Sequence, residues 1–230
     1  EIDEVIMGQV LTGGSGQNPA RQAAITSGIP NEKPAYVVNQ VCGSGIRSVA
    51  SGFQSIISGD SKIIIAGGQE SMSLAPHMIH LRNGKKMGDD KLADTMIKDG
   101  LWDAFNNYHM GTTAENVAEK FQVTREEQDK FAFSSQKKTL KAQKENKFKD
   151  EIINFKIKSK NTEINFTKDE YPRDEISLES LLKLKPVFKH NGTVTAGNAS
   201  GLNDGAAAVT LMSGDEAEKR SINQLAEIKS

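Results

Sequence analysis

The chain of 230 residues carries 29 Lys and Arg against 30 Asp and Glu, and this near-neutral balance excludes a strongly basic nucleic-acid-binding protein and an acidic disordered tail. Its single cysteine excludes an internal disulfide, and no apolar run reaches the roughly 18 residues that a membrane-spanning helix needs. We therefore expect a soluble, cytoplasmic protein of one or two domains, with no nucleic-acid partner and no membrane partner.

The first 71 residues alternate between strand-like and helix-like segments. Asn18 before Pro19 is typical of a helix start, and apolar residues at spacings of three and four between Gly43 and Ile57 indicate a second helix. This alternation predicts an α/β layered sheet. The predicted elements are a strand at 4–11, a helix from 18 to 28, a strand at 34–41, a helix from 43 to 59 and a central strand at 62–66.

The sequence changes character after residue 71. Thr124 and Glu127 match a capping box, which supports a helix start at this point. The expected elements are an irregular stretch at 72–100, helices at 113–121 and 124–147, short exposed strands at 151–171 and a small-residue loop at 192–201.

An apolar run at 206–212 has the composition of a strand that rejoins the first sheet. The sequence therefore predicts a core domain made of 1–71 and 203–230. It predicts that residues 72–202 form an inserted α+β domain.

Cys42 lies where a predicted strand ends and an amphipathic helix begins. A helix N-terminus presents unpaired N–H groups and a partial positive charge, an environment that favours a thiolate nucleophile. Gly43 and Gly45 suit a sharp turn and a close approach of substrate to the backbone. A buried, inert cysteine is equally compatible with this position.

Four histidines are candidates for a base or a metal ligand. His77 and His80 have the i, i+3 spacing of a metal pair on a helix, but the sequence offers no third ligand, so we expect a solvated loop and no metal site. His190 precedes a glycine turn and is expected to be exposed. His109 comes just before a predicted helix, and its position is as compatible with a role in packing as with a role in catalysis or binding.

A basic run at 137–160 holds nine lysines against three acids. Few aromatic residues interleave it, so we interpret it as a solvated helix face rather than a nucleic-acid platform.

Several runs of the sequence together resemble the thiolases, and most closely their biosynthetic acetyl-CoA acetyltransferases. The most specific are Val-Cys-Gly-Ser-Gly at 41–45 and Gly-Thr-Val-Thr-Ala-Gly-Asn-Ala-Ser-Gly-Leu-Asn-Asp-Gly at 192–205. The other matching runs are at 16–21, 66–72, 99–105 and 108–116.

The resemblance implies a thiolase-like αβα core, half of an αβαβα sandwich, with 72–202 as a loop domain that contacts coenzyme A (CoA). It implies an acyltransferase that reversibly condenses two acetyl-CoA molecules to acetoacetyl-CoA, with CoA thioesters as substrates and no bound cofactor. Cys42 matches the nucleophile, which would carry the acyl group as a thioester.

The resemblance also implies a set of CoA-contacting residues. His109 and Met110 match the pantetheine channel, and Arg173 matches the arginine near the adenine and phosphates. Simple packing remains an equal alternative for Ser180, Leu184 and Phe188. The full set is Leu101, His109, Met110, Arg173, Ser180, Leu184, Phe188, Ala196, Gly197 and Ser200.

Other family motifs, among them a Gly-His-Pro histidine and a Cys-x-Gly base cysteine, do not occur in this sequence. We therefore expect the chain to be the N-terminal part of a longer thiolase, inactive by itself. A basic loop at 77–87 resembles the one that joins thiolase dimers into tetramers, so we expect a homo-oligomer, a dimer or a homotetramer. The alternatives are a degradative 3-ketoacyl-CoA thiolase and a non-catalytic acyl-CoA-binding module.

Overall fold

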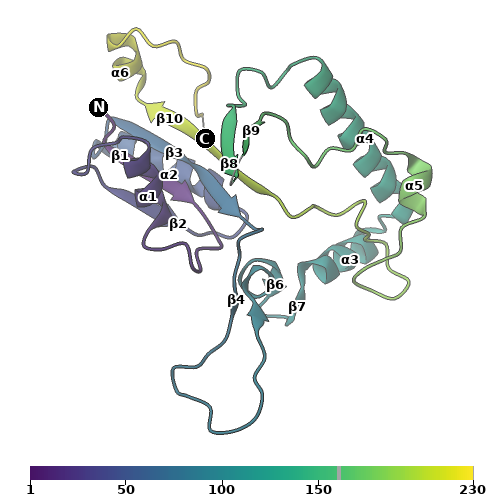
Figure 1. The fold of residues 1–230 in the computed structure, drawn as a ribbon. Coiled ribbons are helices and arrows are strands. Elements are labelled where there is room, and N and C mark those ends of the chain that lie inside the picture. Colours follow the sequence, from purple (N-terminus) through teal and green to yellow (C-terminus); the bar gives the residue numbers. More distant parts are fainter. Residues whose placement is uncertain (160–161, 230) are drawn as a thin grey trace. The chain divides into compact units, whose positions relative to one another are not determined.

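The computed structural model describes residues 1–159 and 162–229, and these residues form two compact units (Figure 1). The first unit consists of Glu1–Trp102 and the segment from Leu202 onward. The second unit is Asp103–Gly201.

A four-stranded sheet forms the centre of the first unit. Its order is β10-β3-β1-β2, from β1 (Glu4–Gly8), β2 (Ala35–Val38), β3 (Ile63–Ser71) and β10 (Asp204–Met212). The first three strands in the sequence run parallel, whereas β10 pairs antiparallel with β3. The predictions of a central strand near 62–66 and of a strand at 206–212 that rejoins the sheet are both confirmed.

Two helices cover opposite faces of this sheet. Because side chains alternate along a strand, Val5 and Met7 of β1 pack with α1 (Pro19–Thr26), whereas Ile6 packs on the face where α2 (Ser44–Ser58) lies. The first unit thus has helix, sheet and helix layers, which confirms the predicted α/β class.

Local sequence signals mark the helix ends correctly. The Asn18 side chain caps α1 by accepting from the Arg21 N–H at 3.1 Å. Gly59 ends α2 in the left-handed conformation with φ of 83°.

β2 ends at Val38, before the predicted residue 41, and long-range contacts decide two further strand ends that differ from the predicted ones. β1 ends at Gly8 instead of continuing to residue 11. The N–H groups of Val10 and Leu11 donate to the Glu70 carboxylate at 2.9 and 3.0 Å instead of to a neighbouring strand. β3 continues past residue 66 to Ser71, because it pairs with β10 along its whole length.

Residues 72–102 group with the first unit, so the division at 102 and 201 differs from the predicted boundaries at 71 and 202. The physical reason is that this stretch packs on the loop after β1: a Cβ on Gly13 would lie 3.5 Å from the Pro76 ring, and a Cβ on Gly100 would lie 3.5 Å from the Leu11 side chain. Within the stretch, the Thr95 N–H and hydroxyl both donate to the Pro76 carbonyl. The stretch contains β4 (His77–Met78), β5 (Ala93–Asp94) and the π-helix η1 (Met96–Leu101), and β6 (Trp102–Asp103) lies at the boundary between the units.

The second unit has three helices and a hairpin among its described residues. The capping box of Thr124 and Glu127 is present at the start of α4, as predicted. α3 begins before the predicted 113, because the His109 side chain caps it. The elements are β7 (Tyr108–His109), α3 (Met110–Phe121), α4 (Arg125–Lys144), the exposed hairpin β8 (Phe155–Ser159) and β9 (Thr162–Phe166), and α5 (Leu178–Leu182).

The short helix α6 (Gly214–Lys219) follows β10 in the first unit. None of the helices in the described part of the chain has the length and apolar character needed to cross a membrane.

Candidate active site

Cys42 lies in the tight turn that joins β2 to α2, and its side chain is exposed. The turn is held by its own polar side chains: Asn39 Oδ1 accepts from the Val41 N–H at 2.9 Å, and Ser44 Oγ accepts from the Gln40 N–H at 2.9 Å. The exposed side chain excludes the alternative of a buried cysteine. The thiol is therefore presented from a fixed backbone.

Val41, the residue before the cysteine, has a strained backbone. Its φ of 50° lies in the left-handed region, which β-branched residues strongly disfavour. Such strain persists only where surrounding contacts enforce it, and it concentrates at functional sites. The strain at Val41 is therefore an independent indication that the position of Cys42 matters.

The first turn of α2 packs backbone against backbone on the strand ends. A Cβ atom on Gly8 would lie 2.3 Å from the Ser44 carbonyl carbon, so only glycine permits this approach. Ser48 is fully buried, and its Oγ lies 2.7 Å from the carbonyl oxygens of both Gly45 and Gly67. These contacts seat the start of α2 at the carboxyl ends of the parallel strands, where α/β sheets commonly bind ligands.

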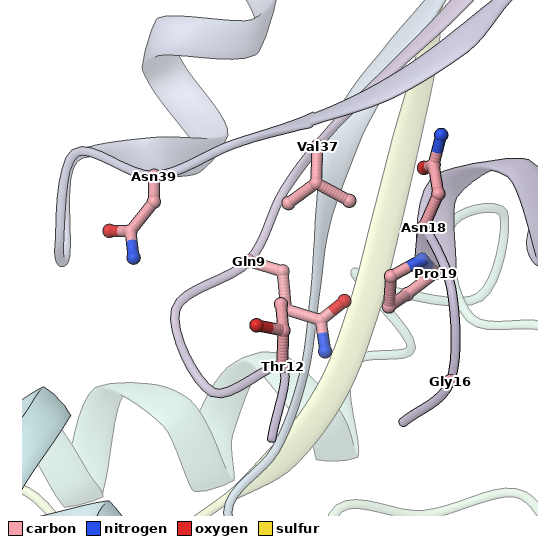
Figure 2. A pocket seen from close by; sticks show the side chains of 7 residues that line it. All are labelled: Gln9, Thr12, Gly16, Asn18, Pro19, Val37 and Asn39. Atoms are coloured by element: carbon pink, nitrogen blue, oxygen red, sulfur yellow. The ribbon is translucent and has the colours of Figure 1, made fainter. Parts of the chain in front are cut away.

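A cavity of about 340 Å³ opens beside the loop that follows β1 (Figure 2). Asn39 connects it to the cysteine turn, because the same side chain lines the cavity and accepts from Val41. Its lining residues are Gln9, Thr12, Gly16, Asn18, Pro19, Val37 and Asn39.

Of the residues matched to CoA contacts, Leu101 belongs to the first unit together with Cys42, and the other nine belong to the second unit. Leu101 is half-buried at the end of η1. Within the second unit, the structure brings several of the predicted residues together.

His109 and Phe188 form one such group. Their rings stack with centroids 4.8 Å apart, and His109 Nδ1 accepts from the Gly111 N–H at 2.9 Å. A Cβ on Gly111 would lie 2.3 Å from the Phe188 ring, so glycine is required for this packing. Met110, at the start of α3, is 41% exposed beside the stacked pair.

Leu184 and Gly197 form a second group. A Cβ on Gly197 would lie 2.5 Å from the side chains of both Leu181 and Leu184, so the loop lies directly against α5. Ala196 and Ser200 of the same loop are exposed.

Ser180 and Arg173 are both exposed and have local partners. Ser180 takes part in the capping box of α5, where its Oγ donates to the Ser177 carbonyl at 2.7 Å. The Arg173 N–H donates to Gln136 Oε1 at 3.1 Å.

Glu115 was not among the candidate residues predicted from the sequence, yet its side chain binds the start of the small-residue loop at 192–201 through hydrogen bonds. It is 3% exposed, and its carboxylate accepts from the N–H groups of Thr193 and Val194 at 2.8 Å and from the Thr193 hydroxyl at 2.9 Å. Burial works against ionisation, but these hydrogen bonds and the charge of Lys189 outweigh it and lower the pKa of Glu115.

A lowered pKa makes Glu115 a source of pH-dependent stability. Its contribution is fully present above its ordinary pKa of 4.5 and is lost as the pH falls through the lowered value. We expect the free energy of unfolding to decrease on acidification, and Glu115→Gln to weaken this dependence. Urea denaturation of both proteins between about pH 6 and pH 3 measures the effect. Parallel stability curves would contradict the assignment.

Within the described residues, no three His, Cys, Asp or Glu side chains are arranged to hold a metal ion.

Comparison with known proteins extends these observations. A model of the family described as "Thiolase, N-terminal domain" matches residues 1–215. An acetyl-CoA acetyltransferase of Rhizobium meliloti is 61% identical over all 230 residues, and one of Paracoccus denitrificans is 59% identical. This chain spans 58% and 59% of the length of these two relatives.

The crystal structure of an acetyl-CoA acetyltransferase from Bacillus anthracis has a similar fold, with a TM-score of 0.94 and 40% sequence identity. The match covers 97% of this chain and 57% of that one. The predicted fold class is therefore confirmed by an independent structure.

Proposed function

This chain belongs to the thiolase family, and on that premise we propose that the complete protein containing it condenses two acetyl-CoA molecules to acetoacetyl-CoA. The observation that carries the proposal is the exposed Cys42 in a strained turn at the start of α2. The family and the relatives named acetyl-CoA acetyltransferase support the same substrate class.

In the proposed reaction the Cys42 thiolate attacks the carbonyl carbon of acetyl-CoA. The C–S bond to CoA breaks, and CoA leaves as a thiol after taking up a proton. A second acetyl-CoA then loses an α-proton to a base, and its carbanion attacks the acetyl-cysteine carbonyl. Collapse of that adduct forms acetoacetyl-CoA and returns the Cys42 thiolate. Thiolysis is the same sequence in reverse.

We propose that the second unit contributes CoA contacts. The exposed residues Ala196 and Ser200, with Gly197 between them, lie on one small-residue loop, where a ligand can lie against the backbone. Arg173 is exposed and would pair with a phosphate, for which its guanidinium is well suited.

We also propose that the complete protein is a cytoplasmic homo-oligomer. An exposed apolar face on α2 supports this part of the proposal, because such a face favours contact with another apolar surface. Ile46 and Ile57 lie on this face and are 74% and 69% exposed. The intervening Ala50 and Phe53 are only partly buried.

The decisive experiment is mass spectrometry of the complete protein after incubation with acetyl-CoA. We expect one acetyl group on the peptide that contains Cys42, and its loss when CoA is added in excess. Absence of the adduct would contradict the enzyme assignment and leave CoA binding alone. Faster turnover on a longer 3-ketoacyl-CoA than on acetoacetyl-CoA would instead contradict the short-chain substrate.

A further inference from the structure

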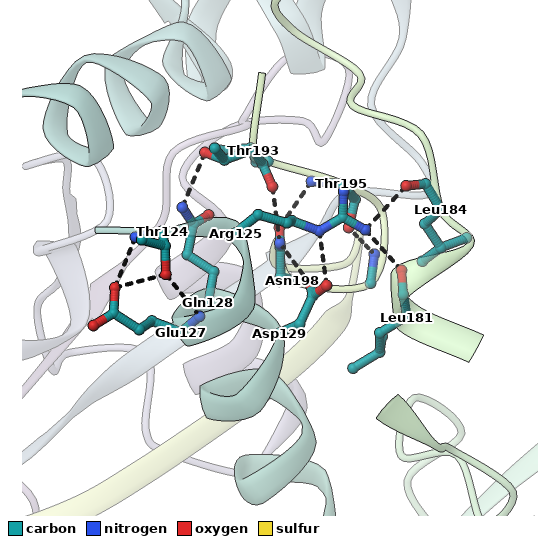
Figure 3. Close-up of polar contacts among 12 residues, drawn as sticks. Thr124, Arg125, Glu127, Gln128, Asp129, Leu181, Leu184, Thr193, Thr195 and Asn198 are labelled. Carbon is teal, nitrogen blue, oxygen red and sulfur yellow. Dashed lines mark hydrogen bonds and ion pairs between the residues drawn. The ribbon is translucent and has the colours of Figure 1, made fainter. Parts of the chain in front are cut away.

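Among the described residues of the second unit, the most fully buried charged side chain is that of Asp129, on α4, which is 1% exposed. Its two oxygens have different partners: Oδ2 accepts from Arg125 Nε at 2.7 Å and Oδ1 accepts from Asn198 Nδ2 at 2.9 Å (Figure 3). A buried carboxylate is costly unless it is paired and hydrogen-bonded, so both partners are held firmly in place.

The first partner extends to α5. Arg125 Nη2 donates to the carbonyl oxygens of Leu181 and Leu184 at 2.7 and 3.0 Å. These carbonyls lie at the end of a helix of five residues, which is too short to be stable alone and which a cation at its C-terminus stabilises. Arg125 therefore fixes the segment 178–184, which carries Ser180 and Leu184.

The second partner extends to the small-residue loop. Asn198 Nδ2 also donates to the Thr193 carbonyl at 3.0 Å, and Asn198 Oδ1 accepts from the Thr195 N–H at 2.8 Å. Gln128, on the same helix as Asp129, donates to the Thr193 hydroxyl at 2.9 Å. In Figure 3 the side chains of Gln128 and Asp129 extend from α4 toward Thr193 and Asn198 of the loop.

The same loop has a buried side and an exposed side. Val194 and Thr195 are buried, Thr195 completely, whereas Ala196 and Ser200 are exposed. The network therefore holds one side of the loop and leaves the other side accessible.

We infer that Asp129 is a positioning residue that couples two CoA-contacting segments, 178–184 and 192–201, through Arg125 and Asn198. The inference rests on the proposed function, because the contacts of these segments with CoA are part of that proposal. Asp129 touches no substrate; it orders both segments before CoA arrives, so that binding does not have to order them.

Asp129→Asn tests the inference with almost no change in volume. The asparagine side chain has one neutral carbonyl oxygen, so it can accept from only one of the two partners. Its NH₂ group then faces the other partner, Arg125 Nε or Asn198 Nδ2, and both of these are hydrogen-bond donors. We expect amide hydrogen exchange to accelerate in both segments by on the order of tenfold, with exchange in the sheet of the first unit unchanged.

In the complete protein, the same variant is expected to raise both the Kd of CoA and the KM for CoA in thiolysis by on the order of tenfold. The kcat at saturating CoA should stay within about twofold, because lost binding is common to the ground state and the transition state. A general structural defect would lower kcat as well.

The matched control is Glu126→Gln, which removes an acid from the neighbouring position of the same helix. Glu126 also pairs with a cation four residues away, Lys130, at 2.6 Å, but both side chains are exposed. We expect no change in exchange or in the affinity for CoA.

Asn198→Ala keeps the test decisive if Asp129→Asn does not fold. It should accelerate exchange strongly in 192–201 and only slightly in 178–184, since Arg125 keeps its bond to Asp129 and the only loss there is the packing of the loop on Leu181 and Leu184.

Unchanged exchange in both segments of folded Asp129→Asn, or a change in only one, would overturn the coupling. A change in both segments with unaltered CoA affinity would overturn the positioning role. Wild-type protein that binds no CoA would contradict the proposed function itself, and the exchange pattern would still decide the coupling.

Discussion

Replacing Cys42 with serine is expected to abolish both the acetyl adduct and turnover of the complete protein. A serine hydroxyl stays protonated near neutral pH and is a weak nucleophile, whereas a thiol readily supplies the thiolate. We expect kcat to decrease by on the order of 10³-fold or more, as is typical when a nucleophile is removed. Steady-state thiolysis and mass spectrometry of the labelled peptide measure the two effects.

The control for this variant is its free energy of unfolding. Since Cys42 is exposed and the turn is held by Asn39 and Ser44, Cys42→Ser should change the free energy of unfolding by no more than about 0.5 kcal/mol. Retention of full activity would refute the nucleophile assignment. A large loss of stability would mean that the cysteine acts in packing.

Gly8→Ala is expected to produce the largest loss of stability among the changes discussed. The added Cβ would lie 2.3 to 2.6 Å from three backbone atoms of Ser44 and Gly45, which cannot rotate away as a side chain could. We expect the free energy of unfolding to decrease by about 3 kcal/mol, at the upper end of overpacking effects. Urea denaturation followed by circular dichroism measures it.

Because the clash falls on the first turn of α2, the variant should also displace the cysteine turn and slow acetylation of Cys42 in protein that remains folded. Gly205→Ala is the matched control: Gly205 lies in β10 of the same sheet, and a Cβ there would meet no atom within 4 Å. It should leave the stability unchanged or slightly raised. Equal stability of the two variants would contradict the close approach of β1 to α2.

Much of the first unit could be predicted because its signals are local. A cap at Asn18, a terminating Gly59 and an apolar stripe along α2 depend on residues only a few positions apart. The position of Cys42 between a strand and a helix is likewise a short-range feature, and the family resemblance then points to its chemistry. The extents of β1 and β3 were predicted less well, because contacts with Glu70 and with β10 decide them.

The candidate CoA contacts are predictions from resemblance, residue by residue. The stacking of His109 on Phe188 and the packing of Gly197 on Leu184 became visible only in the structure. Glu115 lies in the run 108–116 and Asn198 in the run 192–205, both of which match thiolase motifs. Membership in these motifs was a sequence signal that could have identified both residues as structurally important.

The sequence by itself determined the α/β class, the helix boundaries set by caps and the place of the single cysteine, since these follow from neighbours along the chain. Only the tertiary structure decided which polar residues organise the second unit. Glu115 meets Thr193 across 78 positions and Asp129 meets Asn198 across 69. The sequence does not distinguish a helical carboxylate that will be buried from one that will be exposed. Only a carboxylate that folding removes from water needs hydrogen-bond partners within the protein.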